Sequence, residues 1–459
     1  MQKRLVILGG GESGVGAAIL GKTLGFDVFV SDFGTIADHY QQQLKDEGIA
    51  YEQGQHTEAL ILNASEVIKS PGIPPTAPLI RKLEAQGTPI ISEIEFAGRY
   101  TTSKMVCITG SNGKTTTTML IYHILREAGV NVGLAGNVGR SLALQVARDP
   151  HDVYVVELSS FQLENMYDFK ANIAVMLNIT PDHMDRYDHK MENYVRAKFR
   201  IIRNMTPTDA FIFWQDDPVI EAQLRQVATD AQLIPFAEHA EENTRAYIDA
   251  ENELIINPVG NPPLVMPRAD LALNGLHNLY NSMAAGLSAS LLHVKNDDIR
   301  RALSDFEGVE HRLEYVDTID GVRWINDSKA TNVNSCWYAL ESMPTQGRNV
   351  VLILGGKDKG NDYSEILPLV RRKVKAIVAM GLHNEKIIDF FKDDVAEIAD
   401  THTLEDAISA CRRLASEGDT VLLSPCCASF DLFTSYENRG ELFKAAVRAL
   451  SSSAATTSK

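Results

Sequence analysis

The sequence has few cysteines, no long apolar run and no excess of positive charge, and each absence excludes a class of protein. The five cysteines include the adjacent pair Cys426 and Cys427 and show no CxxC spacing, so we expect buried, reduced thiols rather than a disulfide framework or a zinc site. No run of about 18 uncharged apolar residues occurs, so no membrane span is predicted. Lys and Arg number 44 and Asp and Glu 60, which gives a net charge of −16. This balance argues against nucleic acid and anionic membranes as partners.

The remaining composition is that of a globular protein. The hydrophobic fraction is 44% and the charged fraction 23%, both ordinary values, and 459 residues favour about three domains. The first residues, MQKRLVILGGG, enter a strand-like segment and lack the apolar region and small residues of a signal peptide. We therefore expect a cytoplasmic location.

Short apolar runs alternate with amphipathic helical patterns along most of the chain. This alternation predicts an α/β fold in which crossover helices join buried parallel strands. It comes in three blocks, which we predict to be domains at 1–98, 99–305 and 306–459. Within the second block, the stretch from about 206 to 270 has short strands and several prolines, and it is interpreted as a small subdomain or insertion.

A glycine-rich turn follows the first predicted strand, Leu5–Leu8. Residues Gly9–Gly14 match GxGxxG, and Asp32 ends the second strand, an arrangement typical of NAD-binding domains. Any turn that brings the backbone close to a phosphate favours glycine. The motif alone therefore supports only a helix N-terminus that can hold a diphosphate, and a purely structural tight turn remains an alternative.

A second glycine-rich turn, TGSNGKT, lies between the predicted strand Met105–Thr109 and a helix. Backbone N–H groups of such a loop bind phosphate oxygens, Lys114 would reach the β- and γ-phosphates, and the Thr115 hydroxyl would bind Mg²⁺. The full pattern GxxxxGK[ST] requires glycine at 108, where Ile108 stands. The match is therefore to the shorter form GxxGKT, and a solvated glycine turn is the alternative.

Polar residues follow further predicted strands. Glu157 ends the apolar strand Val153–Glu157, where a carboxylate is well placed to bind Mg²⁺. His183 follows the next strand in NITPDHMDRY and is either a metal ligand or a loop histidine. In the third block, the polar loops NDSKATN, GGKDKG and SPCCASFD follow three strands. Because ligands of open α/β sheets bind at the carboxyl ends of strands, these lysines and hydroxyls suit an anionic ligand.

Taken together, the motifs resemble those of the Mur ligases, the ATP-dependent amide-forming enzymes of peptidoglycan precursor synthesis. The resemblance covers nearly the whole chain and rests on GSNGKTTT, ELSSFQLE, NITPDHMDRY, YVRAKFR, GLHNLYN, EHR, NDSKATN, GGKDKG and SPCCASFDLF. Several motifs are shared with folylpolyglutamate synthase, but the layout of the first block, NDSKATN and SPCCASFDLF are most similar to the D-glutamate-adding member. The resemblance implies a UDP-binding Rossmann-like N-terminal domain, a central P-loop ATPase domain and a Rossmann-like C-terminal domain for the incoming amino acid.

The resemblance also implies an activity, namely the ligation of D-glutamate to UDP-N-acetylmuramoyl-L-alanine through an acyl phosphate, with ATP as co-substrate and two Mg²⁺ ions. The implied catalytic residues are Lys114, Glu157, His183, Lys198 and Lys329, and the implied metal ligands are Thr115, Glu157, His183 and Lys198. Lys198 would carry a carbamate, which forms only on a neutral amine and so requires a pKa below the usual value of about 10.4. The residues alone would favour a surface lysine on an amphipathic helix.

The remaining site residues are likewise implied by the resemblance. The ATP contacts would be Gly110, Asn112, Gly113, Lys114, Thr115, Thr116, Asn278, Asn281, Arg312 and Asp327. The contacts to the UDP-linked substrate would be Gly11, Ser13, Gly14, Gly16, Asp32, Ser70, Gly72, Asn137, Ser159 and Gln162. The D-glutamate contacts would be Thr331, Lys359, Ser429 and Tyr436. Lys357 is close enough to compete with Lys359, and Phe430 stands where an aliphatic residue is frequent in the family.

Three alternative functions differ in their ligands. An amide ligase of the same class could use another Mur substrate or a polyglutamate chain, an oxidoreductase would bind NAD at the first glycine turn, and a nucleotide sensor would bind ATP without turnover. For the leading hypothesis we expect a monomer whose partners are its small-molecule substrates, with no nucleic acid and no membrane insertion.

Overall fold

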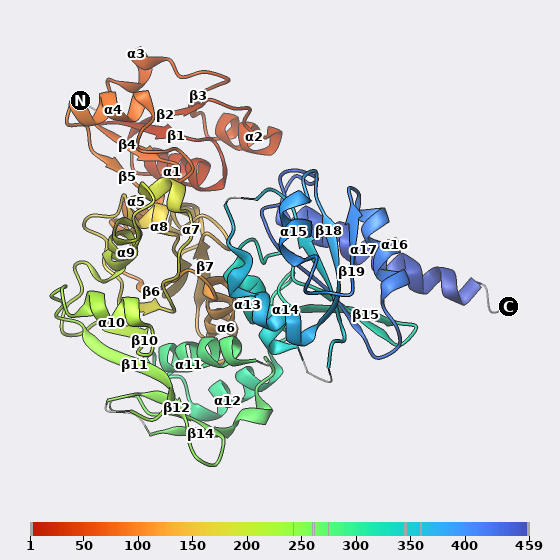
Figure 1. Cartoon of the computed structure of the whole chain (residues 1–459). Helices are drawn as coiled ribbons and strands as arrows, with labels where there is room; N and C mark the ends of the chain where they lie inside the picture. The colour runs from red at the N-terminus through yellow and green to blue at the C-terminus, as the bar shows by residue number, and fades with distance from the viewer. Residues whose placement is uncertain are drawn as a thin grey trace. The chain divides into compact units, whose positions relative to one another are not determined.

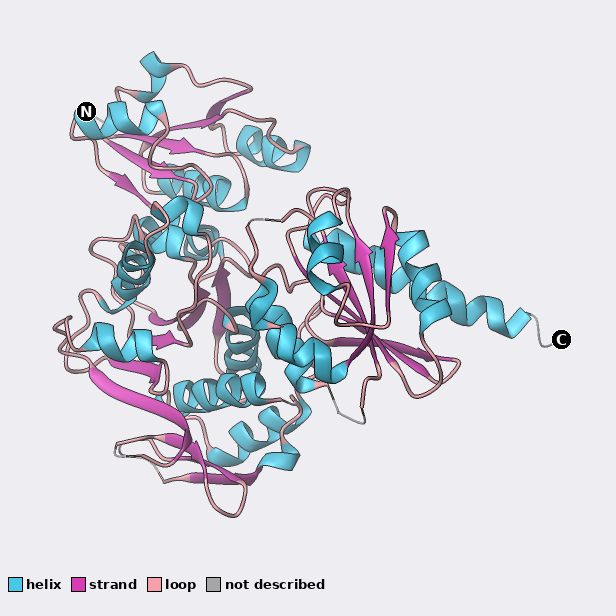
Figure 2. Ribbon diagram, in the orientation of Figure 1, coloured by secondary structure: helices cyan, strands magenta, loops and turns pink. Residues whose placement is uncertain are grey.

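The computed structural model describes residues 3–456 except 242, 259, 261, 274, 344–346 and 359, and it describes no side chain after residue 450. The chain divides into two compact units (Figures 1 and 2). Unit 1 comprises Met1–Leu271 with Tyr280–Phe306, and unit 2 comprises Ala272–Leu279 with Glu307–Lys459. Each unit is described separately below.

The first sheet of unit 1 has five parallel strands in the order β3-β2-β1-β4-β5. Its strands are β1 (Arg4–Leu8), β2 (Asp27–Asp32), β3 (Ala50–Gln53), β4 (Glu66–Lys69) and β5 (Ile90–Ile91). Its helices are α1 (Glu12–Thr23), α2 (Asp38–Asp46), α3 (Glu58–Ile61), α4 (Pro78–Ala85) and α5 (Glu93–Gly98). The central strand β1 is buried along almost all of its length, as expected for a strand that is covered on both faces.

The second sheet of unit 1 has nine strands in the order β14-β13-β12-β11-β10-β9-β6-β8-β7. They are β6 (Lys104–Thr109), β7 (Val132–Gly136), β8 (Val153–Glu157), β9 (Ile173–Met176), β10 (Ala210–Trp214), β11 (Gln232–His239), β12 (Ala246–Ile248), β13 (Glu253–Ile256) and β14 (Leu264–Pro267). Pairing is parallel from β7 to β12 and antiparallel from β12 to β14. The helices are α6 (Lys114–Glu127), α7 (Leu142–Arg148), α8 (Ser160–Leu163), α9 (Met191–Phe199), α10 (Pro218–Leu224), α11 (Leu276–Leu291), which begins in unit 2, and α12 (Asn296–Asp305). Short 3₁₀ helices occur at η1 (Met184–Tyr187), η2 (Arg200–Ile202) and η3 (Arg268–Asp270).

The sheet of unit 2 has six strands in the order β15-β16-β20-β17-β18-β19, of which only β15 pairs antiparallel. They are β15 (Glu314–Ile319), β16 (Val322–Asn326), β17 (Val350–Gly355), β18 (Val374–Met380), β19 (Glu397–Thr401) and β20 (Thr420–Cys426). The helices are α13 (Val333–Ser342), η4 (Tyr363–Glu365), α14 (Leu367–Lys373), α15 (Glu385–Phe391), α16 (Leu404–Leu414) and α17 (Tyr436–Thr456). Every residue of β17 and β20 is buried, which explains why both strands are mostly apolar.

The α/β class and the three mostly parallel sheets predicted from the sequence are confirmed. The stretch 206–270, interpreted as a small subdomain or insertion, does not form a sheet of its own, because β10 pairs with β9 and β11 to β14 continue the same sheet; an insertion at the edge of that sheet stays a prediction. The domain boundaries stay a prediction, since the first two sheets belong to one compact unit. Among the described residues, no helix is both long enough and apolar enough to cross a membrane.

Candidate active site

The loop between β6 and α6 is a preformed cradle in unit 1. Gly110 and Gly113 adopt positive φ angles of 152° and 82°, which glycine reaches without strain. The Asn112 N–H donates to Asn178 Oδ1 over 2.8 Å, and Asn178 Nδ2 donates back to the Asn112 carbonyl over 3.1 Å. The loop after β9 thus braces this turn, which leads into the N-terminus of α6, a position that favours anions.

The first residues of α6 bring the predicted phosphate contacts to this loop. Lys114 Nζ donates to the carbonyl oxygens of Gly110 and Ser111 over 2.8 and 2.9 Å. Thr115 and Thr116 follow and are both buried, and the Thr116 hydroxyl has no partner among the described residues. The arrangement therefore places a lysine and two hydroxyls at one helix N-terminus.

Glu157 is a buried carboxylate with one oxygen unused. Its side chain is 1% exposed, and Oε1 accepts from Asn137 Nδ2 over 3.1 Å. Oε2 has no hydrogen-bond partner within the described part of the chain. Because an unpaired buried carboxylate oxygen is costly and oxygen is the preferred ligand of Mg²⁺, the residue fits a divalent cation. A hydroxyl on Thr115 adds a second oxygen donor to the predicted metal set.

Lys198 lies inside unit 1, so the surface position that its sequence pattern alone favours is wrong. The residue is 1% exposed, and its Nζ donates to the Gly110 carbonyl over 2.7 Å and lies 4.7 Å from the centre of the Tyr194 ring. Burial, reinforced by the nearby charge of Lys114, holds the pKa of Lys198 well below its usual value. Asp182 and Glu157 act in the opposite direction. The amine therefore contacts the phosphate loop in a buried setting that favours its neutral form.

His183 begins the 3₁₀ turn η1 in a left-handed conformation, with φ of 53°. Its Nε2 lies 3.6 Å from Asp182 Oδ2, and its ring meets Phe161 at 5.0 Å between centroids. The imidazole is about two-fifths exposed and so can be reached from solvent. Its metal role stays a prediction. Asp182, which sequence reasoning did not single out, is an acid that acts on the pKa of Lys198.

A small cavity at the carboxyl ends of β1 and β4 collects part of the predicted UDP-substrate set. The residues of that set that line it are Ser13, Gly14, Ser70 and Gln162. Position 14 requires glycine for a local steric reason, because a Cβ there would lie 1.9 Å from the Gly9 carbonyl oxygen. Sequence reasoning missed two ionisable residues that line the same cavity, Lys69 and Glu93.

Several other predicted UDP-substrate residues have structural tasks in unit 1. Asp32 accepts from the N–H groups of Gly10 and Gly34 over 2.6 and 2.7 Å, so its carboxylate orders the glycine turn. A Cβ on Gly16 would lie 2.0 Å from Ser141 Oγ, so this glycine allows α1 to pack against the segment that begins α7.

Two further residues of the predicted UDP-substrate set cap the helix α8. Ser159 and Gln162 form a reciprocal capping box at its N-terminus, which accounts for both residues without a ligand. Asn137 is bonded to Glu157, whereas Gly11 has open space around its α-carbon and Gly72 only a distant neighbour. The structure thus brings four of the ten predicted residues into one cavity and leaves the substrate roles of the others as predictions.

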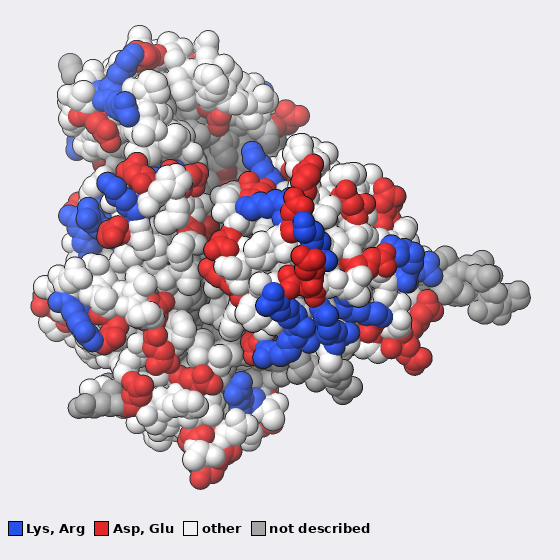
Figure 3. Space-filling model, in the orientation of Figure 1, with Lys and Arg blue, Asp and Glu red and all other residues white. Residues whose placement is uncertain are grey.

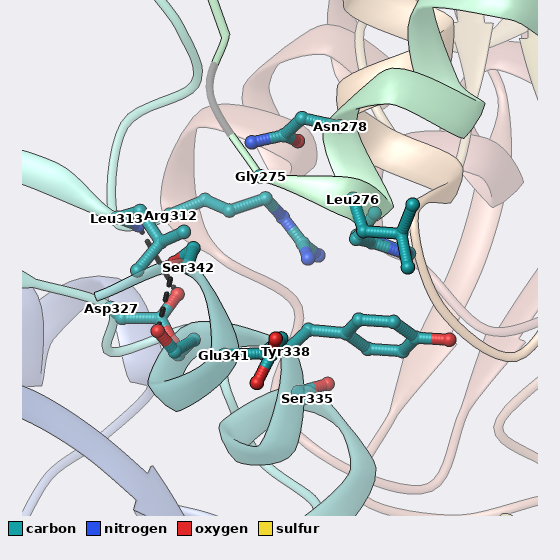
Figure 4. Close-up of a pocket in the computed structure, with 12 residues that line it drawn as sticks. Gly275, Leu276, Asn278, Arg312, Leu313, Asp327, Ser335, Tyr338, Glu341 and Ser342 are labelled. Atoms are coloured by element: carbon teal, nitrogen blue, oxygen red, sulfur yellow. Dashed lines mark hydrogen bonds between the residues drawn. The ribbon is translucent and has the colours of Figure 1, made fainter. Parts of the chain in front are cut away.

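A pocket within unit 2 brings together three predicted ATP contacts, Asn278, Arg312 and Asp327 (Figure 4). Arg312 extends between Asn278 and Tyr338. Asp327 Oδ1 accepts from the Leu313 N–H over 3.2 Å, and Oδ2 accepts from Ser424 Oγ over 2.8 Å. Burial raises the pKa of Asp327 to about 7, although Arg312 opposes the shift.

Sequence reasoning did not single out the aromatic wall of this pocket. His277 and Tyr338 both line it, with ring centroids 4.2 Å apart and planes inclined by 31°. Burial, together with the charge of Arg312, lowers the pKa of His277 to about 3. The imidazole is therefore neutral at physiological pH and offers a flat, uncharged surface. The only sequence signal was the HN pair within GLHNLYN.

Asn281, predicted to contact ATP, is buried in unit 1 at 1% exposure. Its Oδ1 accepts from Thr117 Oγ1 over 3.1 Å. This hydrogen bond connects α11 to α6, the helix that follows the phosphate loop. Asn281 therefore has a structural role in holding these two helices together. A direct contact with ATP stays a prediction.

Of the predicted D-glutamate residues, Thr331 and Ser429 lie on loops of unit 2, and Tyr436 begins α17. Lys329 Nζ lies 5.3 Å from the centre of the Tyr436 ring. Arg439, which is 1% exposed, donates to the Ser328 carbonyl over 2.8 Å and to the Cys427 carbonyl over 3.2 Å. A buried arginine that sequence reasoning missed thus joins the loop NDSKATN to SPCCASFDLF.

The other predicted D-glutamate residues differ in their exposure. Ser429 is buried and Thr331 is half-buried, whereas Phe430 is largely exposed. Lys359 lies outside the described residues. The N–H of its competitor Lys357 donates to the Ala428 carbonyl over 2.8 Å, so the two loops pair at this point.

Comparison with known proteins gives matches along nearly the whole chain. The family models that match are the Mur ligase MurD-like N-terminal domain at 3–92, the Mur ligase middle domain at 108–289, and the Mur ligase glutamate ligase domain at 311–427. A UDP-N-acetylmuramoylalanine--D-glutamate ligase of Bacteroides fragilis is 62% identical over 449 residues, covering 98% of this chain and 100% of that protein. The protein of the same name from Porphyromonas gingivalis is 57% identical over 441 residues, covering 96% and 97%.

Solved structures share the fold at low identity. The UDP-N-acetylmuramate-alanine ligase of Thermotoga maritima has a TM-score of 0.62 at 19% identity and covers 98% of this chain and 100% of its own. Folylpolyglutamate synthase of Mycobacterium tuberculosis has a TM-score of 0.57 at 17% identity and covers 79% and 93%.

Proposed function

This chain belongs to the Mur ligase family, and we propose that it joins D-glutamate to UDP-N-acetylmuramoyl-L-alanine at the expense of ATP. The observation that carries the proposal is the 62% identity over 98% of the chain to a protein named for that reaction. The match to the folylpolyglutamate synthase structure, at 17% identity, shows a shared fold and does not favour a polyglutamate substrate.

The reaction must overcome the low reactivity of a free carboxylate. Attack of the alanyl carboxylate oxygen on the γ-phosphorus of ATP forms an acyl phosphate and releases ADP. The neutral amine of D-glutamate then attacks the acyl carbon, and the tetrahedral intermediate expels phosphate as the amide forms and the nitrogen loses one proton. Two anions must meet in the first step, so the protein contributes mainly alignment and charge compensation.

The phosphate loop and α6 supply these contributions in unit 1. The N–H groups of the loop would hold phosphate oxygens, and Lys114 would exchange its two carbonyl partners for the phosphates. Thr115 and the unpaired Oε2 of Glu157 would hold Mg²⁺. When bound, the ion screens the phosphate charge and makes the phosphorus more electrophilic.

Lys198 would supply a further metal ligand after carbamylation, with His183 on a second ion. The reaction with CO₂ needs an unprotonated amine, and the burial that lowers the pKa of Lys198 supplies one. Carbamylation would convert this buried neutral amine into an anion beside Lys114, which acts on it electrostatically. The new charge would therefore be partly compensated by a group already present.

The other substrates are assigned to the remaining clusters. Ser13, Gly14 and Ser70, which line one small cavity, would contact the UDP-linked substrate. The pocket around Asn278, Arg312 and Asp327 would receive the nucleoside of ATP. The residues Thr331, Lys359, Ser429 and Tyr436 would contact D-glutamate. We further propose that the enzyme works as a cytoplasmic monomer.

Phosphate release with defined acceptors tests the function. We expect phosphate release only when ATP, UDP-N-acetylmuramoyl-L-alanine and D-glutamate are all present. No release is expected when L-glutamate replaces D-glutamate or when a folate replaces the UDP-linked substrate. A Lys114→Met variant serves as the inactive control. Release with a folate acceptor would overturn the substrate assignment, and ATP binding without turnover for any acceptor would indicate a sensor. Quenching of NADH fluorescence on titration would favour the oxidoreductase.

The role of Lys198 has its own test. A Lys198→Ala variant should lose ligation but recover part of it when short carboxylic acids are added, because they can replace the carbamate as a metal ligand. Intact mass measured under CO₂ should show the added carbamate only in the parent protein. Full activity of Lys198→Ala would rule this role out.

A further inference from the structure

Two cations from unit 1 hold the turn that carries the predicted UDP-substrate residues Ser70 and Gly72. Lys69, 3% exposed, donates through Nζ to the carbonyl oxygens of Ile73 and Ser70 over 2.9 and 3.4 Å. Arg186 Nη1 donates to the Pro71 carbonyl over 3.1 Å. Three carbonyls of the turn, those of Ser70, Pro71 and Ile73, thus accept from these two side chains, whose positions therefore constrain its shape.

Arg186 comes from a distant part of the sequence and reaches a third element as well. It lies in η1, three residues after His183, and its Nη2 donates to Glu164 Oε2 over 2.8 Å. The guanidinium also lies over the Phe161 ring, 4.1 Å from its centre, with 11% of the side chain exposed. One planar group from the η1 loop therefore has partners on the turn after β4 and at both ends of α8.

The loop that carries Arg186 needs such anchors. His183, Asp188 and His189 all have positive φ angles, of 53°, 55° and 56°, and residues other than glycine hold that conformation only when their surroundings impose it. The bonds of Arg186 to Glu164 and to the Pro71 carbonyl supply two such constraints. Loss of either would let the segment around His183 relax together with the turn.

We propose that Arg186 is a positioning residue that couples the turn binding the UDP-linked substrate to the loop bearing His183. The inference rests on the proposed function and adds a specific mechanical link within that site. A guanidinium is suited to the task because its fork donates to two acceptors in fixed directions, whereas a lysine offers a single point charge. Binding of the UDP-linked substrate and organisation of the His183 loop should then depend on the same side chain.

Steady-state kinetics of the full chain tests the coupling through Arg186→Met and Arg186→Lys. We expect Arg186→Met to raise KM for UDP-N-acetylmuramoyl-L-alanine roughly tenfold or more, since two charge-assisted bonds are lost. The Mg²⁺ concentration for half-maximal activity should rise with it, while KM for ATP and for D-glutamate changes less than about threefold. Arg186→Lys should recover only part of the loss.

Arg99→Met is the matched control. Arg99 is also a partly buried arginine of unit 1 with two carboxylate partners, Glu66 at 2.8 Å and Glu95 at 3.1 Å, but it does not touch the turn. Its removal should leave all three KM values within about twofold. Glu164→Gln, which keeps the size of the partner and removes its charge, should raise the same KM as Arg186→Met by a smaller factor. The double variant should show less than the product of the two effects.

The outcomes separate this inference from the proposed function. If the parent protein ligates D-glutamate and Arg186→Met leaves KM for the UDP-linked substrate unchanged, or raises all three KM values equally, the coupling is wrong although the function stands. If the parent protein has no ligase activity, the function itself fails. Should Arg186→Met not fold, as judged by its thermal transition, the Arg186→Lys and Glu164→Gln variants decide by the same KM pattern.

Discussion

Asp327 should reduce the stability of unit 2 at neutral pH, and Asp327→Asn should restore it. The carboxyl group is 4% exposed, and burial raises its pKa to about 7 from an ordinary value of 3.8. An asparagine has the same shape and can keep both partners, because its oxygen accepts from the Leu313 N–H and its amide donates to Ser424 Oγ. The substitution therefore removes the charge and leaves the packing unchanged.

The magnitude follows from the two pKa values. The folded state binds the proton more tightly than the unfolded state, so stability is present at low pH, is lost as the pH rises from about 4 through 7, and remains lost above that range. A raised pKa of about 7 against 3.8 corresponds to at most about 4 kcal/mol at pH 8 and about 2 kcal/mol at pH 5. Because asparagine does not titrate, the stability gained by the variant should shrink by about half over this interval.

Denaturant unfolding followed by tryptophan fluorescence measures the effect. Trp324 and Trp337 belong to unit 2, and a Trp214→Phe background removes the only other tryptophan. Asp389→Asn, at a side chain that is 77% exposed, is the control and should change stability by less than about 0.5 kcal/mol at either pH. Equal or lower stability of Asp327→Asn at pH 8, or a gain that does not change between pH 8 and pH 5, would refute the reasoning.

Two further predictions concern stability alone. Gly16→Ala should destabilise unit 1 by about 1–3 kcal/mol, because its Cβ would lie 2.0 Å from Ser141 Oγ, while Gly11→Ala, with open space around it, should be neutral in thermal unfolding. Lys373→Met should destabilise unit 2 by about 2–4 kcal/mol, because the buried Nζ donates to three carbonyls at the C-terminal end of α13 over 2.7–2.9 Å. Arg372→Met, which removes only an exposed ion pair, should cost less than about 1 kcal/mol. Equal losses within either pair of variants would contradict these assignments.

The local sequence patterns predicted the class of fold because the buried strands have mostly apolar sequences. Strands such as Val153–Glu157 appear in the structure with the bounds expected from the sequence. The sequence left the stretch 206–270 open between a subdomain and an insertion, because its short strands β12 to β14 extend the edge of an existing sheet, and strand pairing of this kind is a tertiary property. Prolines and short strands are typical of the edge of a sheet as well as of a separate subdomain, so they do not distinguish the two.

Within the candidate site, sequence reasoning succeeded where the chemistry is local. The contacts of Lys114 and the brace of its loop lie within one strand-loop-helix motif and the neighbouring strand end. The burial of Lys198 was not visible in its helical pattern, because the elements that cover it come from elsewhere in the chain. Arg186 and Arg439 were missed for the same reason, since their partners lie 115 and 111 residues away. A buried arginine has no local signature, and only its place inside a motif could have drawn attention to it.

The net charge of −16 is a poor guide to the charge of the ligands for a related reason. Acidic and basic side chains are interspersed over the visible surface (Figure 3), where water and salt screen them. Lys69, at 3% exposure, is shielded from that screening, so it interacts with a neighbouring anion more strongly than a surface lysine does. Burial lowers the pKa of its amine to about 8, so the amine is still mostly protonated at pH 7. A desolvated cation of this kind can therefore favour an anionic substrate in a chain that is acidic overall.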